Sequence, residues 1–387
     1  MPTLMKYSVS IGTIFAVGVI LHLCYVGFNG DYGLKGEAGV IRNPIAGSKA
    51  RSNLLDVYNE TLGFQDIFVV SLPERSDKRD AISVQAALTN ISFTLEEAIL
   101  SADVAKKARP YGMEMEGAEV GCWRSHLNVM QNMVRNRIQS VLILEDDADW
   151  DVAIKPQMHQ FARGTRWLLD IPENAPSRSP YGDGWDVLWI GHCSMHSHDQ
   201  DKRRFVIPND PTVHPPDKRD MMLLPDMSPW EHDGPDANNK TRVMFQSAYG
   251  FCSAAWAISL AGAEKIIYEL SMKPFDTAID NGVGGICGLK KHNATCIAPF
   301  PPLVGVSKPA GSLDKGSDIR VEGDAADIRE KATSERVVFS ARLNIDRLLN
   351  GSTEFESLYP ESTGQFMSLK DIGSAVGHGE WVDRLNW

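Results

Sequence analysis

The segment 141–149, VLILEDDAD, constrains the fold of this chain more than any other stretch. Its four aliphatic residues are typical of a parallel strand that is buried on both faces. Carboxylates follow directly, and like charges this close together are tolerated mainly when a cation lies between them. Oxygen ligands at i, i+2 spacing suit Mg²⁺ or Mn²⁺, and open sheets bind ligands at the carboxyl ends of their strands. We therefore predict a metal site that holds a phosphate-bearing substrate.

Two other interpretations of the acidic segment compete with this one. Asp147, Asp149 and Asp151 have the spacing of the first three ligands of an EF-hand loop. That loop needs Gly at its sixth position and Glu at its twelfth, where this chain has Val152 and Met158, so the match fails. A solvated acidic turn after a strand is the simpler alternative, and only the neighbouring motifs speak against it.

The amino-terminal region predicts a membrane anchor. Residues 7–28 contain no charged side chain and are long enough to cross a bilayer, with Lys6 in front of them. We predict a short cytoplasmic tail (1–6), a signal anchor (7–28) and a stem (29–63) rich in Gly and small polar residues, although a cleaved signal peptide is the alternative. The positive-inside rule does not settle the orientation. The net charge of −11 argues against a general nucleic-acid surface.

Asparagine sequons support a lumenal, glycosylated location for the rest of the chain. Five follow the apolar run, at Asn59, Asn90, Asn239, Asn293 and Asn350. Cysteine spacing is less informative, since no CxxC pair exists and thiolate metal binding is therefore not expected. In an oxidising lumen Cys287 and Cys296 are the nearest pair for a disulfide, and the other cysteines can simply be buried.

Apolar runs and helical periodicity predict an alternation of strands and helices. We expect strands at 67–72, 93–99, 141–144, 185–190, 253–258 and 295–299, and helices at 76–88, 116–136, 259–270 and 337–349. Such an alternation implies a parallel α/β sheet with crossover connections. Residues 208–240 form a long irregular insertion, and the polar tail after Asp318 carries no visible chemistry.

Four segments, in this order, resemble glycosyltransferase family 25, the family of lipopolysaccharide and collagen galactosyltransferases. They are FVVSLPERSDKR (68–79), GAEVGCWRSH (117–126, with Ala118 inserted into the family pattern), LEDD (144–147) and AISLAGAEK (257–265) followed by PFD (274–276). The sequence after Pro302 and the length of the 208–240 insertion depart from that pattern. The anchor and the sequons indicate a eukaryotic, secretory-pathway member, with a fungal origin as one option.

The resemblance implies a GT-A fold over residues 64–319, with a Rossmann-like, mostly parallel sheet that binds a nucleotide sugar, and a C-terminal extension (320–387). It implies an inverting hexosyltransferase that uses a UDP-sugar, UDP-galactose first, with Mn²⁺ or Mg²⁺, and a glycan or glycoprotein acceptor, in the Golgi membrane. A catalytically silent lumenal protein that binds nucleotide sugars is one alternative. A metal-dependent phosphohydrolase, for which His192, His196 and His198 offer the second metal's ligands, is another.

The sequence also predicts roles for particular residues. The predicted metal ligands are Glu145, Asp147, Asp149 and His192. Side chains two positions apart point the same way, so the pair is either Glu145 with Asp147 or Asp147 with Asp149, and Asp147 is a ligand in both. The predicted donor-binding residues are Leu72, Arg75, Arg79, Glu119, Ser125, His126 and Asp146. The arginines suit phosphate, Asp146 faces away from the neighbouring metal ligands, toward a ribose or into the loop, and Ser125 and His126 follow from the resemblance. The predicted catalytic residues are Asp276, which matches the family's Pro-x-Asp, and Asp280. For Asp276 a helix cap, and for His126 a structural role, are the alternatives.

Overall fold

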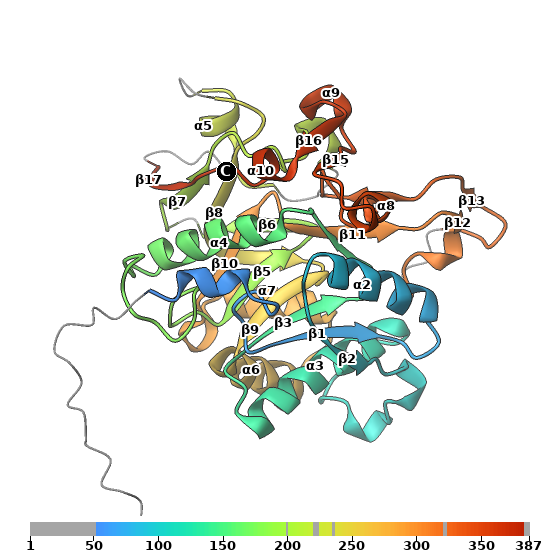
Figure 1. Cartoon of the computed structure of the whole chain (residues 1–387). Coiled ribbons are helices and arrows are strands. Elements are labelled where there is room, and N and C mark those ends of the chain that lie inside the picture. Colours follow the sequence, from blue (N-terminus) through green and yellow to red (C-terminus); the bar gives the residue numbers. More distant parts are fainter. Residues whose placement is uncertain (1–51, 199, 220–223, 234–236, 320–322, 383–387) are drawn as a thin grey trace, which may run out of the picture. The chain divides into compact units, whose positions relative to one another are not determined.

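The computed structural model describes residues 52–198, 200–219, 224–233, 237–319 and 323–382, which belong to one compact unit (Figure 1). The predicted cytoplasmic tail, the predicted anchor and most of the predicted stem lie outside these residues. Within the described ranges no helix is both long and apolar enough to span a bilayer. Leu54–Tyr58 forms a 3-10 helix with Leu54 and Val57 buried in the core, so the folded unit begins ahead of residue 64.

A ten-stranded sheet forms the centre of the unit. The strand order is β17-β7-β8-β10-β5-β9-β3-β1-β2, with β6 paired to β8. The strands are β1 (Asp66–Ser71), β2 (Thr94–Glu97), β3 (Ser140–Glu145), β5 (Val187–Gly191), β6 (Ser194–Ser197), β7 (Arg203–Ile207), β8 (Arg242–Phe251), β9 (Ala255–Ser259), β10 (Cys296–Phe300) and β17 (His378–Trp381). The predictions of β1, β3 and β5 are confirmed within two residues, because their apolar runs are buried on both faces.

The sheet is mixed, and seven of its ten strands run in one direction, in line with the predicted mostly parallel arrangement. β1 pairs in parallel with β2 and β3, and β10 pairs in parallel with β5. β9 lies between β3 and β5 and is antiparallel to both. β8, β9 and β17 run against the other strands of the sheet. An apolar run such as that of β9 predicts burial but carries no direction, so the residue pattern could not reveal this antiparallel insertion.

Helices cover both faces of the sheet (Figure 1). Along β3, Val141 and Ile143 point into the core beneath α3 (Ala118–Asn136), α6 (Leu260–Ile267) and α7 (Ile279–Gly288). Leu142 and Leu144 point to the other face, toward α2 (Ser76–Leu88) and α4 (Ile154–Leu168). This alternation follows from the two-residue period of a strand and explains why the run must be apolar throughout. An α/β fold with a mixed sheet and flanking helices is therefore confirmed.

The carboxyl-terminal residues are part of the same unit. A second sheet joins β14 (Thr333–Glu335), β11 (Val304–Lys308) and β4 (Ala148–Trp150), so the tail pairs next to the acidic segment. The predicted helix at 337–349 is reduced to α8 (Ile345–Leu349), because residues 337–339 and Ala341 are buried in bends and a turn. The smaller elements are α5 (Ser228–Glu231), α9 (Pro360–Thr363), α10 (Leu369–Ile372), β12 (Gly311–Ser312), β13 (Ile328–Arg329), β15 (Glu354–Glu356) and β16 (Phe366–Ser368).

Two disulfides lie in the described residues. The predicted Cys287–Cys296 pair is confirmed. Cys193 and Cys252, expected only to be buried, form a second disulfide between residues 59 positions apart. Cys122 is the free cysteine among the residues described. The asparagines of all five sequons are exposed, as a glycosylation acceptor must be, although their modification stays a prediction.

Candidate active site

A hollow opens where β1, β2 and β3 end and α3 begins. The register pairs Val70 of β1 with Glu145 of β3, so the acidic turn after β3 lies beside the end of β1. The hollow is open to solvent and encloses about 790 Å³ of space that no protein atom fills, part of it bulk solvent. Its lining includes Ser71, Leu72, Lys78, Leu100, Cys122, Ser125, His126, Glu145, Asp146, Asp147 and Asp318. We refer to it as the first hollow.

A second hollow adjoins the first and shares part of its wall. Cys122, Glu145, Asp147, Ser317 and Ile319 line both. The second hollow is also lined by Glu119, Cys252, Ser253, Asp280, Lys308, Glu335 and Arg336. The acidic end of β3 thus lies in the wall shared by the two hollows.

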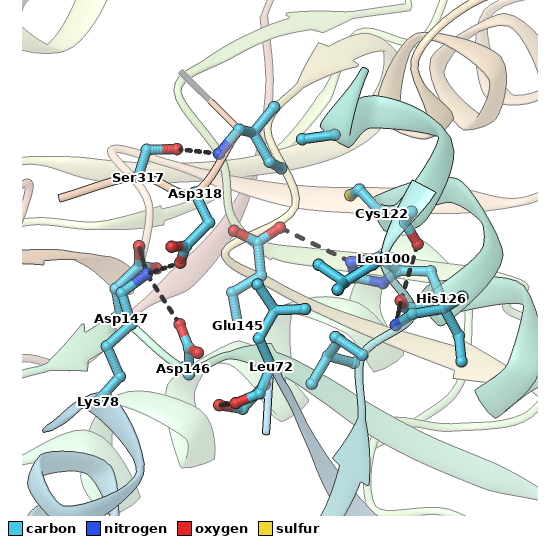
Figure 2. Close-up of a pocket in the computed structure, with 18 of the residues that line it drawn as sticks. Leu72, Lys78, Leu100, Cys122, His126, Glu145, Asp146, Asp147, Ser317 and Asp318 are labelled. Atoms are coloured by element: carbon cyan, nitrogen blue, oxygen red, sulfur yellow. Dashed lines mark hydrogen bonds and ion pairs between the residues drawn. The ribbon is translucent and has the colours of Figure 1, made fainter. Parts of the chain in front are cut away.

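Lys78 lies in the centre of the carboxylate group on one side of Glu145 (Figure 2). Its Nζ is 2.9 Å from Asp318 Oδ2, 3.1 Å from Asp146 Oδ1 and 3.5 Å from Asp147 Oδ2. Burial alone would lower the pKa of Lys78, but the three carboxylates outweigh it and raise that pKa above its usual value. In the free protein the positive charge among these carboxylates is therefore the Lys78 ammonium group.

Asp147 keeps coordinating capacity unused. Burial raises the pKa of Asp147 to about 6, Lys78 opposes that rise, and the neighbouring Glu145 and Asp146 add to it. Its buried Oδ1 has no hydrogen-bond partner. A buried carboxylate oxygen without a partner is costly unless a ligand satisfies it. Glu145, two positions earlier, lines the same hollows, and Mg²⁺-type cations are commonly held by one or two carboxylates plus the phosphates of a substrate. These residues fit the predicted Mn²⁺ or Mg²⁺.

Glu145 faces the opposite group of side chains on α3. The Ser253 hydroxyl donates to Glu145 Oε1 at 2.6 Å, and His126 Nε2 lies 3.7 Å from the same oxygen. Burial would raise the pKa of Glu145, but His126 and Ser253 outweigh that effect and hold it below its usual value. Burial raises the pKa of the nearby Cys122 thiol well above its usual value, and Glu145 adds to that rise.

The predicted donor-binding residues divide into two groups. Leu72, Ser125, His126 and Asp146 line the first hollow, and their contact with a donor stays a prediction. Glu119 lines the second hollow instead. Arg75 lines neither hollow, because its guanidinium pairs with Asp77 and Asp318. Arg79 also turns away and donates to the Ser71 carbonyl at 2.9 Å. The arginines therefore hold the loop around the hollow in the free protein, and their contact with phosphate stays a prediction.

Asp149 and His192, two of the predicted metal ligands, are buried and bonded to other parts of the protein. Asp149 is fully buried, and its oxygens accept from Gln85 Nε2, the Ser340 hydroxyl and the Arg342 backbone N–H. Asp149 thus bonds to the carboxyl-terminal tail, at Ser340 and Arg342. His192 Nε2 contacts the Pro299 carbonyl at 2.7 Å, and burial lowers the His192 pKa to about 4. Neither side chain lines either hollow, so this geometry gives no support to their predicted metal ligation, which stays a prediction.

The two predicted catalytic carboxylates lie in different surroundings. Asp276 is exposed and lines neither hollow, and its Oδ1 accepts from the backbone N–H groups of Glu114 and Met115 at 2.9 and 2.7 Å. It thus holds the loop before α3 and does not cap α7, whose N-cap is Ala278, so the helix-cap alternative is not what the structure shows; its role as general base stays a prediction. Asp280, in the first turn of α7, lines the second hollow and accepts from the Cys252 backbone N–H at 2.7 Å.

Some residues of the site had no role in the sequence-based prediction. Lys78 stands inside the quoted motif at 68–79, yet one lysine among Arg75 and Arg79 carries no distinguishing signal. Asp318 reaches Lys78 across 240 residues of sequence, so no local pattern could join them. Ser253 and Cys122 contribute through contacts formed only by the fold.

Comparison with known proteins supports the resemblance. The family model described as Glycosyltransferase family 25 (LPS biosynthesis protein) matches residues 64–165, the stretch from β1 to α4. Procollagen galactosyltransferase 2 of Homo sapiens is 25% identical over 187 residues, which are 45% of this chain and 27% of that protein. Procollagen galactosyltransferase 1 of Danio rerio is 22% identical over 248 residues, 60% of this chain and 33% of that protein.

Another relative has a name that denotes loss of activity. The probable inactive glycosyltransferase 25 family member 3 of Bos taurus is 23% identical over 153 residues, 36% of this chain and 24% of that protein. The matches to these three relatives cover a third or less of each relative's length. The similarity is distant, but it includes the first two of the four motif segments and the acidic turn itself. The resemblance to glycosyltransferase family 25 is therefore confirmed, with its profile match on residues 64–165.

Proposed function

We propose that this protein is a metal-dependent, inverting glycosyltransferase that moves a hexose from a UDP-sugar to a hydroxyl group of a glycan or glycoprotein. Galactose is the first candidate hexose, because the named relatives are galactosyltransferases. The observation that carries the proposal is the pair of adjacent hollows with Glu145 and Asp147 in their common wall. One hollow would hold the donor and the other the acceptor.

The donor would occupy the first hollow, with its diphosphate at the acidic turn. Bound Mn²⁺ would neutralise the charge that develops on the leaving diphosphate. Glu145 and Asp147 would hold this cation, and Asp147 Oδ1, which has no hydrogen-bond partner in the protein, would be one of its ligand atoms. Lys78, already among these carboxylates, would add a second positive charge beside the phosphates. Leu72, Ser125 and His126 would line the space for the nucleoside.

The acceptor would occupy the second hollow, where Asp280 is the proposed general base. Inversion needs one base and no covalent intermediate. Asp280 would remove the proton from the acceptor hydroxyl while that oxygen forms a bond to the anomeric carbon and the bond to the diphosphate breaks. The hydrogen bond from Cys252 N to Asp280 Oδ2 fixes the direction of the carboxylate. The Cys193–Cys252 disulfide therefore supports the base through the backbone.

We also propose a secretory-pathway location, in the Golgi membrane with the folded unit in the lumen. Two disulfides and five exposed sequon asparagines support an oxidising, glycosylating compartment. The anchor is a proposal from the sequence of residues 7–28 alone.

Calorimetry of donor binding is the test of the proposed function. The full chain would be titrated with a panel of nucleotide sugars, with and without Mn²⁺, beside Asp147→Asn and the control Asp103→Asn, which changes an exposed carboxylate. We expect one UDP-sugar to bind only with Mn²⁺, and Asp147→Asn alone to abolish this binding. Release of UDP that depends on an acceptor then measures transfer. Absence of binding to every nucleotide sugar would overturn the proposal.

A silent relative that only binds nucleotide sugars is the second candidate, favoured by the inactive names among similar proteins. Donor binding without any acceptor-dependent UDP release would select it. The phosphohydrolase alternative loses support, because His192 and His198 contact the Pro299 and Cys287 carbonyls. These histidines form no metal-binding group within the part of the chain that the structure describes.

A further inference from the structure

Three side chains with metal-binding atoms converge on the wall between the hollows. Cys122, His126 and Glu145 each offer one ligand atom, and these atoms lie within 4.8 Å of one another. Figure 2 shows Cys122 and His126 on the opposite side of Glu145 from the Lys78 group. No other group of three or more such residues was found among the residues that the structure describes. The proposed function uses none of these three as a unit.

The two elements that carry the ligands are rigid. Cys122 and His126 are four positions apart on α3, so they share one face of this helix, the spacing by which helices present two ligands to one metal. Glu145 ends β3, a central strand of the sheet. The His126 ring is held edge-on against Trp256, at 5.2 Å between ring centroids, and is 1% exposed. Little chain entropy is therefore lost when a metal binds.

The distance between His126 and Glu145 favours a shared metal ion over a hydrogen bond. Nε2 of His126 is 3.7 Å from Oε1 of Glu145, beyond hydrogen-bond length. Two ligands about 2.0–2.1 Å from one tetrahedral Zn²⁺ are about 3.3–3.4 Å apart, so this pair is within a few tenths of an ångström of the separation that a shared ion requires. The Ser253 hydroxyl holds the Glu145 carboxylate, as a partner behind a metal ligand should.

We propose that Cys122, His126 and Glu145 bind Zn²⁺, with the fourth position of the metal open to the two hollows. Sulfur, imidazole and carboxylate together select Zn²⁺, whereas the oxygen pair of Glu145 and Asp147 suits Mg²⁺ or Mn²⁺. Cys122 and Glu145 line both hollows, so the open position faces the space between them. On binding, the Cys122 thiol loses its proton to solvent and its sulfur forms the bond to the metal.

One consequence rests on the proposed function. Glu145 belongs both to this zinc site and to the proposed Mn²⁺ site, so Zn²⁺ bound to Cys122 and His126 withdraws Glu145 from the donor metal. Zn²⁺ is then an inhibitor of the transferase that competes with Mn²⁺. The zinc site itself does not depend on this consequence and can be tested without any sugar donor.

Zinc affinity of the full chain is measured by competition with a chromophoric indicator, for the wild type, Cys122→Ser and Asp147→Asn. We expect one site that Cys122→Ser weakens by more than the about 10–100-fold that loss of an outer-sphere partner costs. Asp147→Asn should bind Zn²⁺ as the wild type does. Equal affinities in the wild type and Cys122→Ser, or no zinc binding by the wild type, would overturn the proposal.

A second measurement removes the ambiguity of a folding defect. Co²⁺ replaces Zn²⁺, and a bond from Co²⁺ to a thiolate gives a charge-transfer absorption that oxygen ligands do not give. The band should be present in the wild type and Asp147→Asn and absent in Cys122→Ser, whose far-ultraviolet circular dichroism should be unchanged. Failure of Mn²⁺-dependent donor binding alongside a normal cobalt band would reject the proposed function and leave the zinc site intact.

Discussion

Lys78 determines whether the acidic turn is stable without a divalent ion. It is 6% exposed and pairs with Asp146, Asp147 and Asp318, the last of which is 32% exposed at its side chain. Removal of the charge leaves carboxylates close together and partly buried. We expect Lys78→Met to lower the free energy of unfolding by about 2–3 kcal/mol, below the about 3–5 of a fully buried pair. Chemical denaturation measures this change, with the exposed Lys107→Met as the control.

Mn²⁺ should discriminate between the two lysine variants. A divalent cation can replace the lost ammonium at the acidic turn, so Mn²⁺ should raise the melting temperature of Lys78→Met more than that of the wild type or Lys107→Met. An equal effect of Mn²⁺ on all three proteins would contradict this account of Lys78.

Asp151 predicts a pH dependence of stability. Burial raises its pKa to about 7, although the Phe339 backbone N–H and Gln157 oppose the rise. The unfolded chain loses this proton near pH 4, so the folded state binds more protons between about pH 4 and pH 7. The contribution of Asp151 to stability is therefore complete below pH 4 and falls as the pH rises to 7. Asp151→Asn, which does not titrate, should show a smaller decline in melting temperature between pH 5 and pH 8. Parallel curves for the two proteins would contradict the assignment.

At the scale of elements, the contact between α3 and the segment after β2 shapes the first hollow. A Cβ on Gly121 would lie 2.3 Å from the Ile99 carbonyl oxygen, and Ile99 lines this hollow. Gly121→Ala should destabilise the protein by about 1–3 kcal/mol and weaken donor binding, because α3 or the 98–101 segment must move. Gly285→Ala in α7 is a matched control, since its Cβ meets no atom within 4 Å and helix propensity favours alanine. Thermal unfolding of both variants tests this prediction. Equal changes in the melting temperatures of Gly121→Ala and Gly285→Ala would contradict the close contact at Gly121.

At the scale of the whole molecule, the two disulfides close loops of different length. Cys193–Cys252 joins residues 59 positions apart, and Cys287–Cys296 joins residues 9 positions apart. Loop-closure entropy assigns about 4 kcal/mol to the first and about 2.6 kcal/mol to the second. Replacement of Cys193 and Cys252 by Ser should therefore lower the melting temperature more than replacement of Cys287 and Cys296. Scanning calorimetry under identical buffer conditions tests the order, which the reverse ranking would refute.

Local patterns predicted the elements of this fold better than their arrangement. The apolar run of β3 and the periodicity of α3 give nearly correct bounds. A strand buried on both faces is apolar at consecutive positions, and a helix buried on one face is apolar at every third or fourth position, so both patterns are local. The same patterns placed Asp149 in the metal site, since i, i+2 spacing is local. Its partner Ser340 lies 191 residues away, and the contact between Asp318 and Lys78 is equally remote. Side-chain direction at the acidic turn depends on such distant contacts, which one sequence does not display.

The position of β9 limits how this protein can be divided for study. Residues 64–165 contain β1 to α4, yet the strand that covers the second edge of β3 comes from residues 255–259. A fragment cut at the limits of the profile match would expose the backbone hydrogen-bonding groups of a long apolar strand. Exposed edges of this kind pair with other chains. Such a fragment would aggregate rather than fold, so recombinant work on the acidic turn requires a chain that extends through the tail.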